Sequence, residues 1–189
     1  LPAPVLQAHA PNAVRAAREY GRACAAASFR GTVIAPDDQH AAHGGAWIAT
    51  TVAALDAAWA WWAALPVPAP VDDAVLAVLF GEYLAQLLSG VPMSATEIIR
   101  PRTIGVEDAA RALETDASVA LFLNNAARPD TRAALARMLA DGARPDEALG
   151  DATLDTVRAQ MRGFAETRIA PHAHRWHLED ALIPDTVVA

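Results

Sequence analysis

Apolar residues recur at spacings of three and four along most of this chain, the period with which an α-helix buries one face. The clearest case covers residues 38–64, and Trp47 and Thr51 are expected to widen its apolar face. The stripe itself consists of Ile48, Val52, Leu55, Trp59 and Trp62. The proline-rich segment 66–70 ends this helix and predicts a stiff linker.

Two further segments are predicted to form long helices. Residues 72–89 are apolar nearly all round, which is typical of a helix covered on several sides. A last helix is expected to begin near Thr153, and Pro171 is expected to kink or restart it. Its apolar stripe consists of Leu154, Val157, Met161 and Phe164, continued by Ile169.

The remaining segments predict shorter helices and no strand. Residues 1–10 are expected to be extended, followed by a helix over 12–28. The capping-box pattern of Ser94 and Glu97 predicts a short helix that Pro101 terminates. Three more helices are expected at 106–113, 116–125 and 130–141, while Val33-Ile34 is too short for a strand. We therefore predict an all-α fold, an antiparallel helical bundle, with a domain boundary between residues 150 and 151.

Composition narrows the function classes. Of the 189 residues, 53% are hydrophobic, and the net charge of −7 argues against a nucleic-acid partner. Every basic residue other than histidine is arginine. No basic n-region with an apolar core opens the chain, and no apolar run reaches the length of a membrane span. We expect a cytoplasmic protein without a membrane partner, in which the lone Cys24 is a small buried residue.

His40 and His43 are the first candidate site. Residues three apart share a helix face, so both imidazoles could hold one metal ion. Glu82, the only acid within the apolar part of helix 72–89, is the candidate third ligand. A buried carboxylate needs a partner, so a structural His–Glu cluster is the favoured interpretation. A metal site and an acid/base pair are the alternatives, and no catalytic, cofactor or metal residue is assigned.

The tryptophan and histidine clusters are likewise interpreted as structural rather than as ligand sites. Trp59 and Trp62 are expected in the core, whereas Trp61 points away from them and could mark an interface. His172, His174 and His177 are interpreted as surface imidazoles around a packed Trp176. The arginines Arg158, Arg162 and Arg168, beside Glu166 and Glu179, predict a salt-bridged solvated face. The pair Gly44-Gly45 is expected to permit close helix packing.

The C-terminal segment carries a family resemblance. It contains Arg162-Gly-Phe164, then Ile169-Ala-Pro-His172, then Trp176, then Ile183-Pro184. In this order and spacing the segment resembles the first helices of the flavin-dependent acyl-CoA dehydrogenase family.

Two further segments resemble a narrower group. Gln39-His-Ala-Ala-His-Gly44 with Ala46-Trp-Ile-Ala-Thr50, and Gly81-Glu-Tyr-Leu-Ala-Gln86 with Gly90-Val-Pro-Met-Ser94, are the residues concerned. They are similar to the helical N-terminal extension of the branch of this family that oxidises methylsuccinyl-CoA in the ethylmalonyl-CoA pathway. The resemblance implies that residues 1–150 form this extension and 151–189 the start of the dehydrogenase helical domain.

The resemblance implies further properties of a longer parent protein. It would be a homo-oligomer that binds FAD and oxidises a branched acyl-CoA to its α,β-unsaturated product. The chain itself would be structural and pack on the remainder of the dehydrogenase core, since no catalytic base or flavin-binding motif of the family matches its residues. Alternatives are a stand-alone helical interaction module and, more remotely, a metal-dependent enzyme built on His40, His43 and Glu82.

Overall fold

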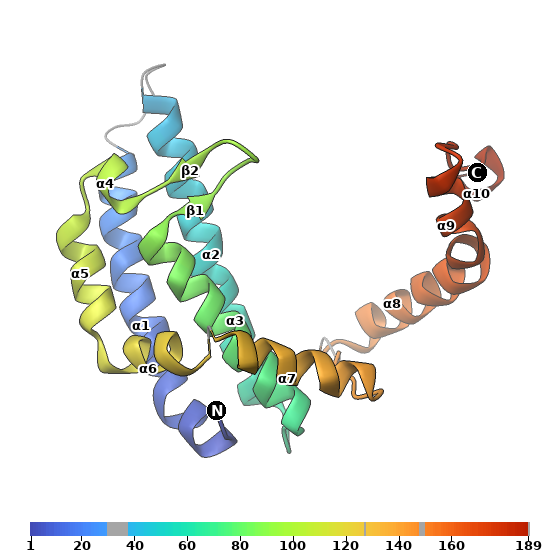
Figure 1. The fold of residues 1–189 in the computed structure, drawn as a ribbon, viewed down its shortest axis with the longest axis horizontal. Coiled ribbons are helices and arrows are strands. Elements are labelled where there is room, and N and C mark those ends of the chain that lie inside the picture. Colours follow the sequence, from blue (N-terminus) through green and yellow to red (C-terminus); the bar gives the residue numbers. More distant parts are fainter. Residues whose placement is uncertain (30–37, 127, 148–149, 189) are drawn as a thin grey trace. The chain divides into compact units, whose positions relative to one another are not determined.

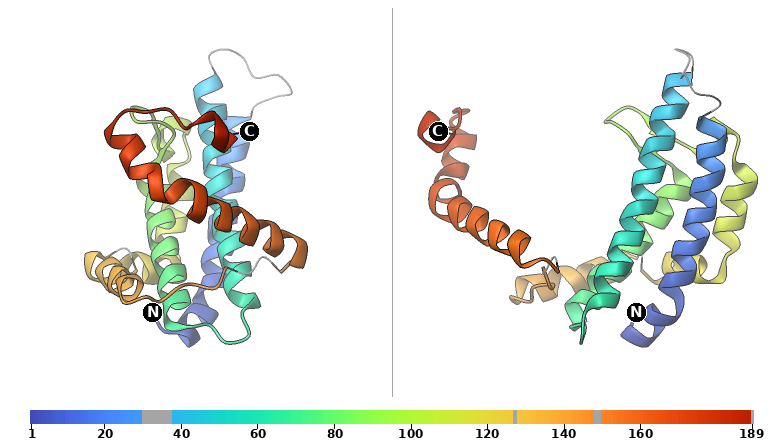
Figure 2. Two further views of the ribbon diagram at one scale, coloured as in Figure 1. Left: turned by 90° about the vertical axis from the view of Figure 1, so that its right-hand side faces the viewer. Right: turned by 180° about the vertical axis from the view of Figure 1, so that it is seen from behind.

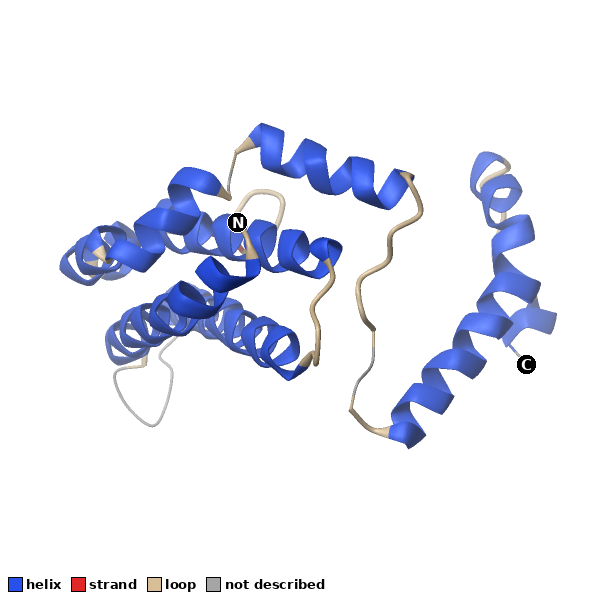
Figure 3. Ribbon diagram, turned by 90° about the horizontal axis from the view of Figure 1, so that it is seen from below, coloured by secondary structure: helices blue, strands red, loops and turns tan. Residues whose placement is uncertain are grey.

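The computed structural model describes residues 1–29, 38–126, 128–147 and 150–188. The chain divides into two compact units, residues 1–145 and residues 146–189 (Figure 1). Helices account for most of the described residues in both units (Figure 3), and the predicted all-α class is confirmed. The segment Val33-Ile34 lies outside the described residues. None of the described helices is both long enough and apolar enough to cross a membrane.

Three long helices form the frame of the first unit. They are α1 (Ala3–Ser28), α2 (Gln39–Ala64) and α3 (Pro70–Ser89). α1 packs along α2, and α2 packs against α3, so that the three lie side by side in each view (Figure 2). The end of α2 is tied to the start of α3, because Trp62 Nε1–H donates to Asp73 Oδ1 at 2.9 Å. This bond closes the proline-rich linker that the sequence predicts.

The core lies between these helices and the shorter ones that cover them. Phe80 of α3 and Phe122 of α6 (Ala117–Asn125) pack with ring centroids 4.9 Å apart. Their side chains, like that of Tyr20, are almost fully buried. On α1 four of the nine buried residues are alanines, and such small side chains allow neighbouring helices to approach closely.

The prediction that residues 1–10 are extended is wrong. α1 begins at Ala3, and Leu6 and Ala10 are fully buried. Pro4 fits the first helical turn, where its missing N–H is not needed. Pro11 lies inside the helix, where it removes one backbone hydrogen bond. Burial of the apolar side chains on both sides of Pro11 offsets that loss, so the helix continues through it.

The prediction of a short helix after Ser94 is also wrong. Strands β1 (Val91–Pro92) and β2 (Ile98–Ile99) form a small antiparallel ladder. Ser94 Oγ accepts the Glu97 N–H at 3.1 Å, and Glu97 O accepts the Met93 N–H at 2.8 Å. The residues of the predicted capping box therefore close a hairpin turn. Pro101, expected to end a helix, instead begins α4 (Pro101–Ile104).

The remaining helices of the first unit agree closely with their predicted ranges. α5 covers Glu107–Thr115 and α7 covers Pro129–Ala140. Asp116 caps α6, because its carboxylate accepts the N–H groups of Ser118 and Val119. This is the cap expected of an aspartate before a helix. α7 packs on α3.

The second unit is a bent helical segment. α8 (Ala152–Phe164) leads into a π-helical turn, η2 (Ala165–Ile169), and then into α9 (Ala170–Leu178). α10 (Asp185–Val188) follows Pro184. The Ala170 N–H donates to Ala165 O five residues back. The widened turn comes directly before Pro171, whose ring would collide with the carbonyl four residues earlier in a regular α-helix. Pro171 thus restarts the helix, as predicted.

Candidate functional site

His40, His43 and Glu82 have separate partners. Glu82 of α3 forms an ion pair with Arg132 of α7 at 2.6 Å, and its side chain is 32% exposed. His40 Nδ1 lies 4.0 Å from Glu97 Oε1 in the hairpin turn. His40 therefore does contact a glutamate, but the glutamate is Glu97 rather than the expected Glu82. No group of three or more potential metal ligands occurs within the described ranges.

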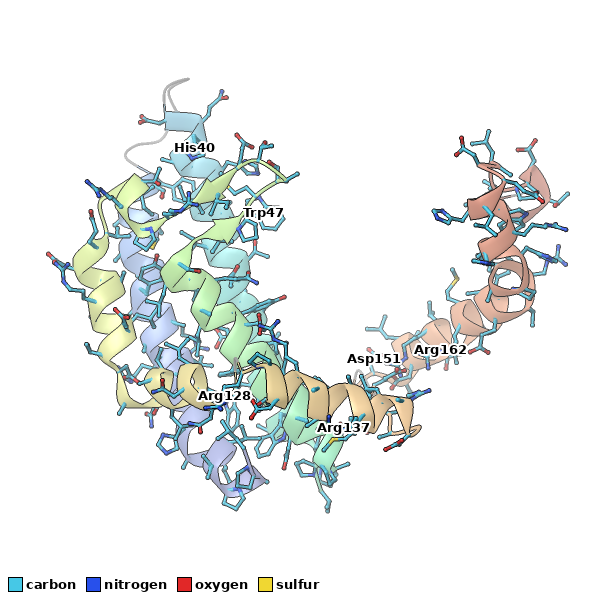
Figure 4. The ribbon with its side chains drawn as sticks, in the orientation of Figure 1. His40, Trp47, Arg128, Arg137, Asp151 and Arg162 are labelled. Carbon is cyan, nitrogen blue, oxygen red and sulfur yellow. The ribbon has the colours of Figure 1, made fainter. Side chains whose placement is uncertain are left out.

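His43 is paired with an exposed tryptophan. Its Nε2 accepts the Trp47 Nε1–H at 2.9 Å, and the two rings meet edge to face. Trp47 is 40% exposed, so it does not widen the buried stripe of α2 as predicted. Figure 4 labels Trp47 and His40 on the same part of α2. The neighbouring Gly44 is buried, and a Cβ there would lie 2.7 Å from the Ile99 Cβ of β2. Close packing at this glycine is therefore against the hairpin.

The tryptophans at the end of α2 belong to the core region. Trp62 is buried and stacks on the half-buried Trp59, with ring centroids 5.6 Å apart, as predicted. Trp61 was expected to be exposed, but it is half-buried and packs against the same core. Trp61 is therefore not the fully exposed tryptophan that the sequence predicts. The sequence could not show this, because the cover over that part of α2 comes from elsewhere in the fold.

The largest set of exposed apolar side chains on one helix lies on α8. These side chains are Leu154, Val157, Met161 and Phe164, which are 38–60% exposed. Their spacing places all four on one face of the helix. No residue of α8 is buried. We call this set the α8 apolar face. The sequence predicts the stripe correctly, but the structure shows that the described residues leave it uncovered.

The polar side of α8 differs in its pairing from the prediction. Arg158 pairs with Asp155 at 2.7 Å, and Arg162 pairs with Glu147 at 2.5 Å. The predicted salt-bridged face is therefore confirmed for these two arginines, with carboxylates other than Glu166 and Glu179 as their partners. Asp151 caps α8 by accepting two backbone N–H groups, and Figure 4 labels Asp151 and Arg162 on this helix. These contacts hold α8 as a helix although its apolar face is exposed.

In the histidine-rich segment, the ring of His172 packs on that of Trp176 at 5.5 Å. Trp176 is half-buried and the three histidines are exposed, which agrees with the interpretation of surface imidazoles around a packed tryptophan. Cys24 and Tyr20 lie together in the core of the first unit. Burial raises the pKa of the Cys24 thiol to about 11, and that of the Tyr20 phenol is raised as well. A neutral buried thiol is a poor nucleophile.

Comparison with known proteins confirms the resemblance. The chain is 37% identical over 158 residues, 80% of its length, to (2S)-methylsuccinyl-CoA dehydrogenase of Cereibacter sphaeroides. It spans 28% of the length of that protein. No family model matches the chain. The chain is thus related by sequence to an acyl-CoA dehydrogenase over a limited part of that enzyme.

Proposed function

We propose that this chain is the N-terminal part of a FAD-dependent acyl-CoA dehydrogenase that oxidises methylsuccinyl-CoA in the cytoplasm, within the ethylmalonyl-CoA pathway. Residues 1–150 would be the helical extension, and residues 151–189 would begin the dehydrogenase helical domain. The 37% identity to one such enzyme, over 28% of its length, supports this assignment. The observation that carries the structural role is the uncovered α8 apolar face.

The α8 apolar face is the surface through which we expect the chain to pack on the rest of the enzyme. Completing the burial of half-exposed apolar side chains contributes about 1 kcal/mol for each. Four such side chains on one helix therefore favour a permanent contact. The expected occupant is the part of the protein that follows Ala189 in sequence.

The reaction of the whole protein would remove a proton α to the thioester and transfer a hydride from the β-carbon to the flavin. We assign neither step to this chain. Glu82 is paired with Arg132, and Glu97 lies in an exposed turn near His40. The cavity of about 530 Å³ beside Arg100 and Glu114 is an open groove with charged side chains, which does not enclose a flavin ring.

The test is to extend the reading frame beyond Ala189 and purify the encoded protein. We expect flavin absorbance, a homo-oligomer by size-exclusion chromatography, and oxidation of methylsuccinyl-CoA with an artificial electron acceptor. Protein without flavin and without acyl-CoA oxidation would contradict the proposal.

A pair of variants tests the role of the α8 apolar face in that longer protein. Met161→Glu adds a charge to this face and should reduce the bound flavin and the yield of the oligomer. Ala159→Glu adds the same charge to the exposed opposite side of α8 and should leave both unchanged. Equal behaviour of the two variants would show that the face does not dock on the enzyme.

A stand-alone interaction module is the alternative, and one observation favours it. Trp47 on α2 and Ile98 on β2 are each more than one-third exposed, so the first unit also presents apolar surface. Under this alternative the chain would bind a separate partner and would need no downstream domain. A reading frame that stops directly after Ala189 would favour it over the dehydrogenase.

A further inference from the structure

Charged side chains of both signs line the groove beside α3, α4 and α5 in the first unit. The groove has a volume of about 530 Å³, which lies in the range of small-ligand sites. Its charged side chains are Arg100, Arg102, Arg111, Glu107 and Glu114. Only Arg111 among them forms an ion pair with a described residue, and its partner is Asp108, outside the lining. The other two arginines and both glutamates therefore line one groove without pairing with each other.

The fold places these unpaired charges on different elements. Arg100 follows β2 directly and Arg102 lies in α4, so this wall of the groove is basic. The stem of Arg100 passes close to Gly90, where a Cβ would lie 3.0 Å from the Arg100 Cγ. Glu107 and Glu114 lie seven residues apart on α5, close to the same face of that helix. The helix α5 therefore supplies the carboxylates of the opposite wall.

The floor of the groove is apolar. Leu88 at the end of α3 and Ala110 of α5 are half-buried and pack against the core of the first unit. Pro101 at the start of α4 adds a third apolar side chain. Arginine stems also cover apolar surface while their charged ends stay in solvent. A ligand that fits this groove therefore has an apolar body as well as charged groups.

The spacing of the two glutamates indicates the length of such a ligand. Seven residues of α-helix extend about 10 Å, and three residues of extended peptide cover a similar length. A tripeptide with apolar side chains and free ends carries one ammonium group and one carboxylate. The carboxylate matches the arginines, because guanidinium groups bind carboxylates through charge-assisted hydrogen bonds, often two at a time. The ammonium group matches the glutamates.

We propose that this groove binds short apolar peptides with free termini. Arg100 and Arg102 would hold the carboxylate, Glu107 or Glu114 would hold the ammonium group, and the apolar side chains would lie on Leu88. The inference does not depend on the proposed dehydrogenase function. All residues of the groove lie in the first unit, and binding can be measured on this chain alone.

The experiment is isothermal titration of the 189-residue chain with the tripeptide alanyl-leucyl-alanine, at pH 7 and low ionic strength. We expect saturable binding. The N-acetylated tripeptide lacks the ammonium group, and the C-terminal amide lacks the carboxylate. Each should bind at least about tenfold more weakly, as expected for the loss of a charge-assisted contact. Absence of saturable binding, or equal affinity of all three peptides, would overturn the proposal.

Two double variants test whether the contacts belong to the groove. Arg100→Gln/Arg102→Gln should weaken binding of the free tripeptide about tenfold, and should leave binding of the amide unchanged because the amide has no carboxylate.

The matched control is Arg22→Gln/Arg137→Gln, which removes the same charge from exposed positions outside the groove. Its affinity should stay within about twofold of the unmodified chain, since screened charges at a distance contribute little. None of the four arginines has an ion pair within the described residues, so both variants should keep the circular dichroism spectrum of the unmodified chain. Equal losses of affinity in the two double variants would show that the groove is not the binding site.

Discussion

Burial raises the pKa of two neighbouring side chains in the core of the first unit. Cys24 is fully buried, and its thiol faces the Tyr20 hydroxyl in the core. Burial disfavours the charged form of both groups, so both pKa values are raised. The chain has no lysine, so few other groups titrate in the alkaline range. The pH dependence of its stability therefore reports on this pair.

We predict that the first unit loses stability between pH 9 and pH 11. The folded thiol holds its proton up to a pKa of about 11, whereas its ordinary value is 9.0. The contribution of the protonated thiol to the free energy of unfolding is fully present below pH 9. It is lost as the pH rises through the folded pKa of about 11. The loss should be on the order of 2 kcal/mol, measured by urea unfolding at pH 8 and pH 10.5. If the stability of the Cys24→Ala variant falls by the same amount between pH 8 and pH 10.5, the thiol is not the cause of the loss.

The elements were predictable to different degrees. Periodicity correctly predicted α2, α3 and α8, because their apolar stripes are long and regular. It failed where the same short sequence pattern is compatible with two local structures. The hydrogen bond from the Glu97 N–H to Ser94 Oγ can form both in a turn and in a helix cap. The packing of Ile99 on α2 favours the hairpin. The start of α1 was not predicted because closely spaced prolines are typical of extended segments. In the structure, burial of Leu6 favours the helix instead.

The tight contact between α2 and the hairpin gives a prediction. Gly44→Ala should destabilise the first unit by about 1–3 kcal/mol, since the new Cβ would meet the Ile99 side chain. Ile99 is 1% exposed and has little room to move. Gly163→Ala is the control, because nothing lies within 4 Å of its added Cβ. Urea midpoints should fall for Gly44→Ala alone, and a fall for both variants would point to a general intolerance of alanine.

The candidate sites were less predictable than the elements. The partner of Glu82 is Arg132, on a helix whose position against α3 no local pattern reveals. The exposed tryptophan is Trp47 instead of Trp61 for the same reason. Arg168 was placed on a salt-bridged face, but it has no ion pair within the described residues. For Glu82 and Trp61 the deciding information is a contact between segments distant in sequence.

At the scale of the whole molecule, the hydrophobic core belongs to one unit. Every buried apolar side chain of the described residues lies before residue 127, whereas no residue of α8 or α9 is buried. Stability of the isolated chain should therefore come from residues 1–145. The second unit contributes surface for other contacts.

This division predicts that residues 1–145 fold without the rest. Brief treatment with proteinase K should cut between residues 146 and 151 and leave the first unit intact. A shortened chain of residues 1–145 should unfold within about 2 °C of the 189-residue chain, equivalent to roughly half a kcal/mol. Loss of cooperative thermal unfolding in the shortened chain would show that the second unit is needed for folding.

The length of the π turn before Pro171 sets the rotation of α9 relative to α8. Five residues close a turn that fewer would close in a regular α-helix. Deleting one residue within 165–169 would rotate everything that follows by about 100° relative to α8. Arg175 and Trp176 would then face away from the direction they have now. The length of this short turn thus sets an angle, and point substitutions there should be tolerated far better than insertions or deletions.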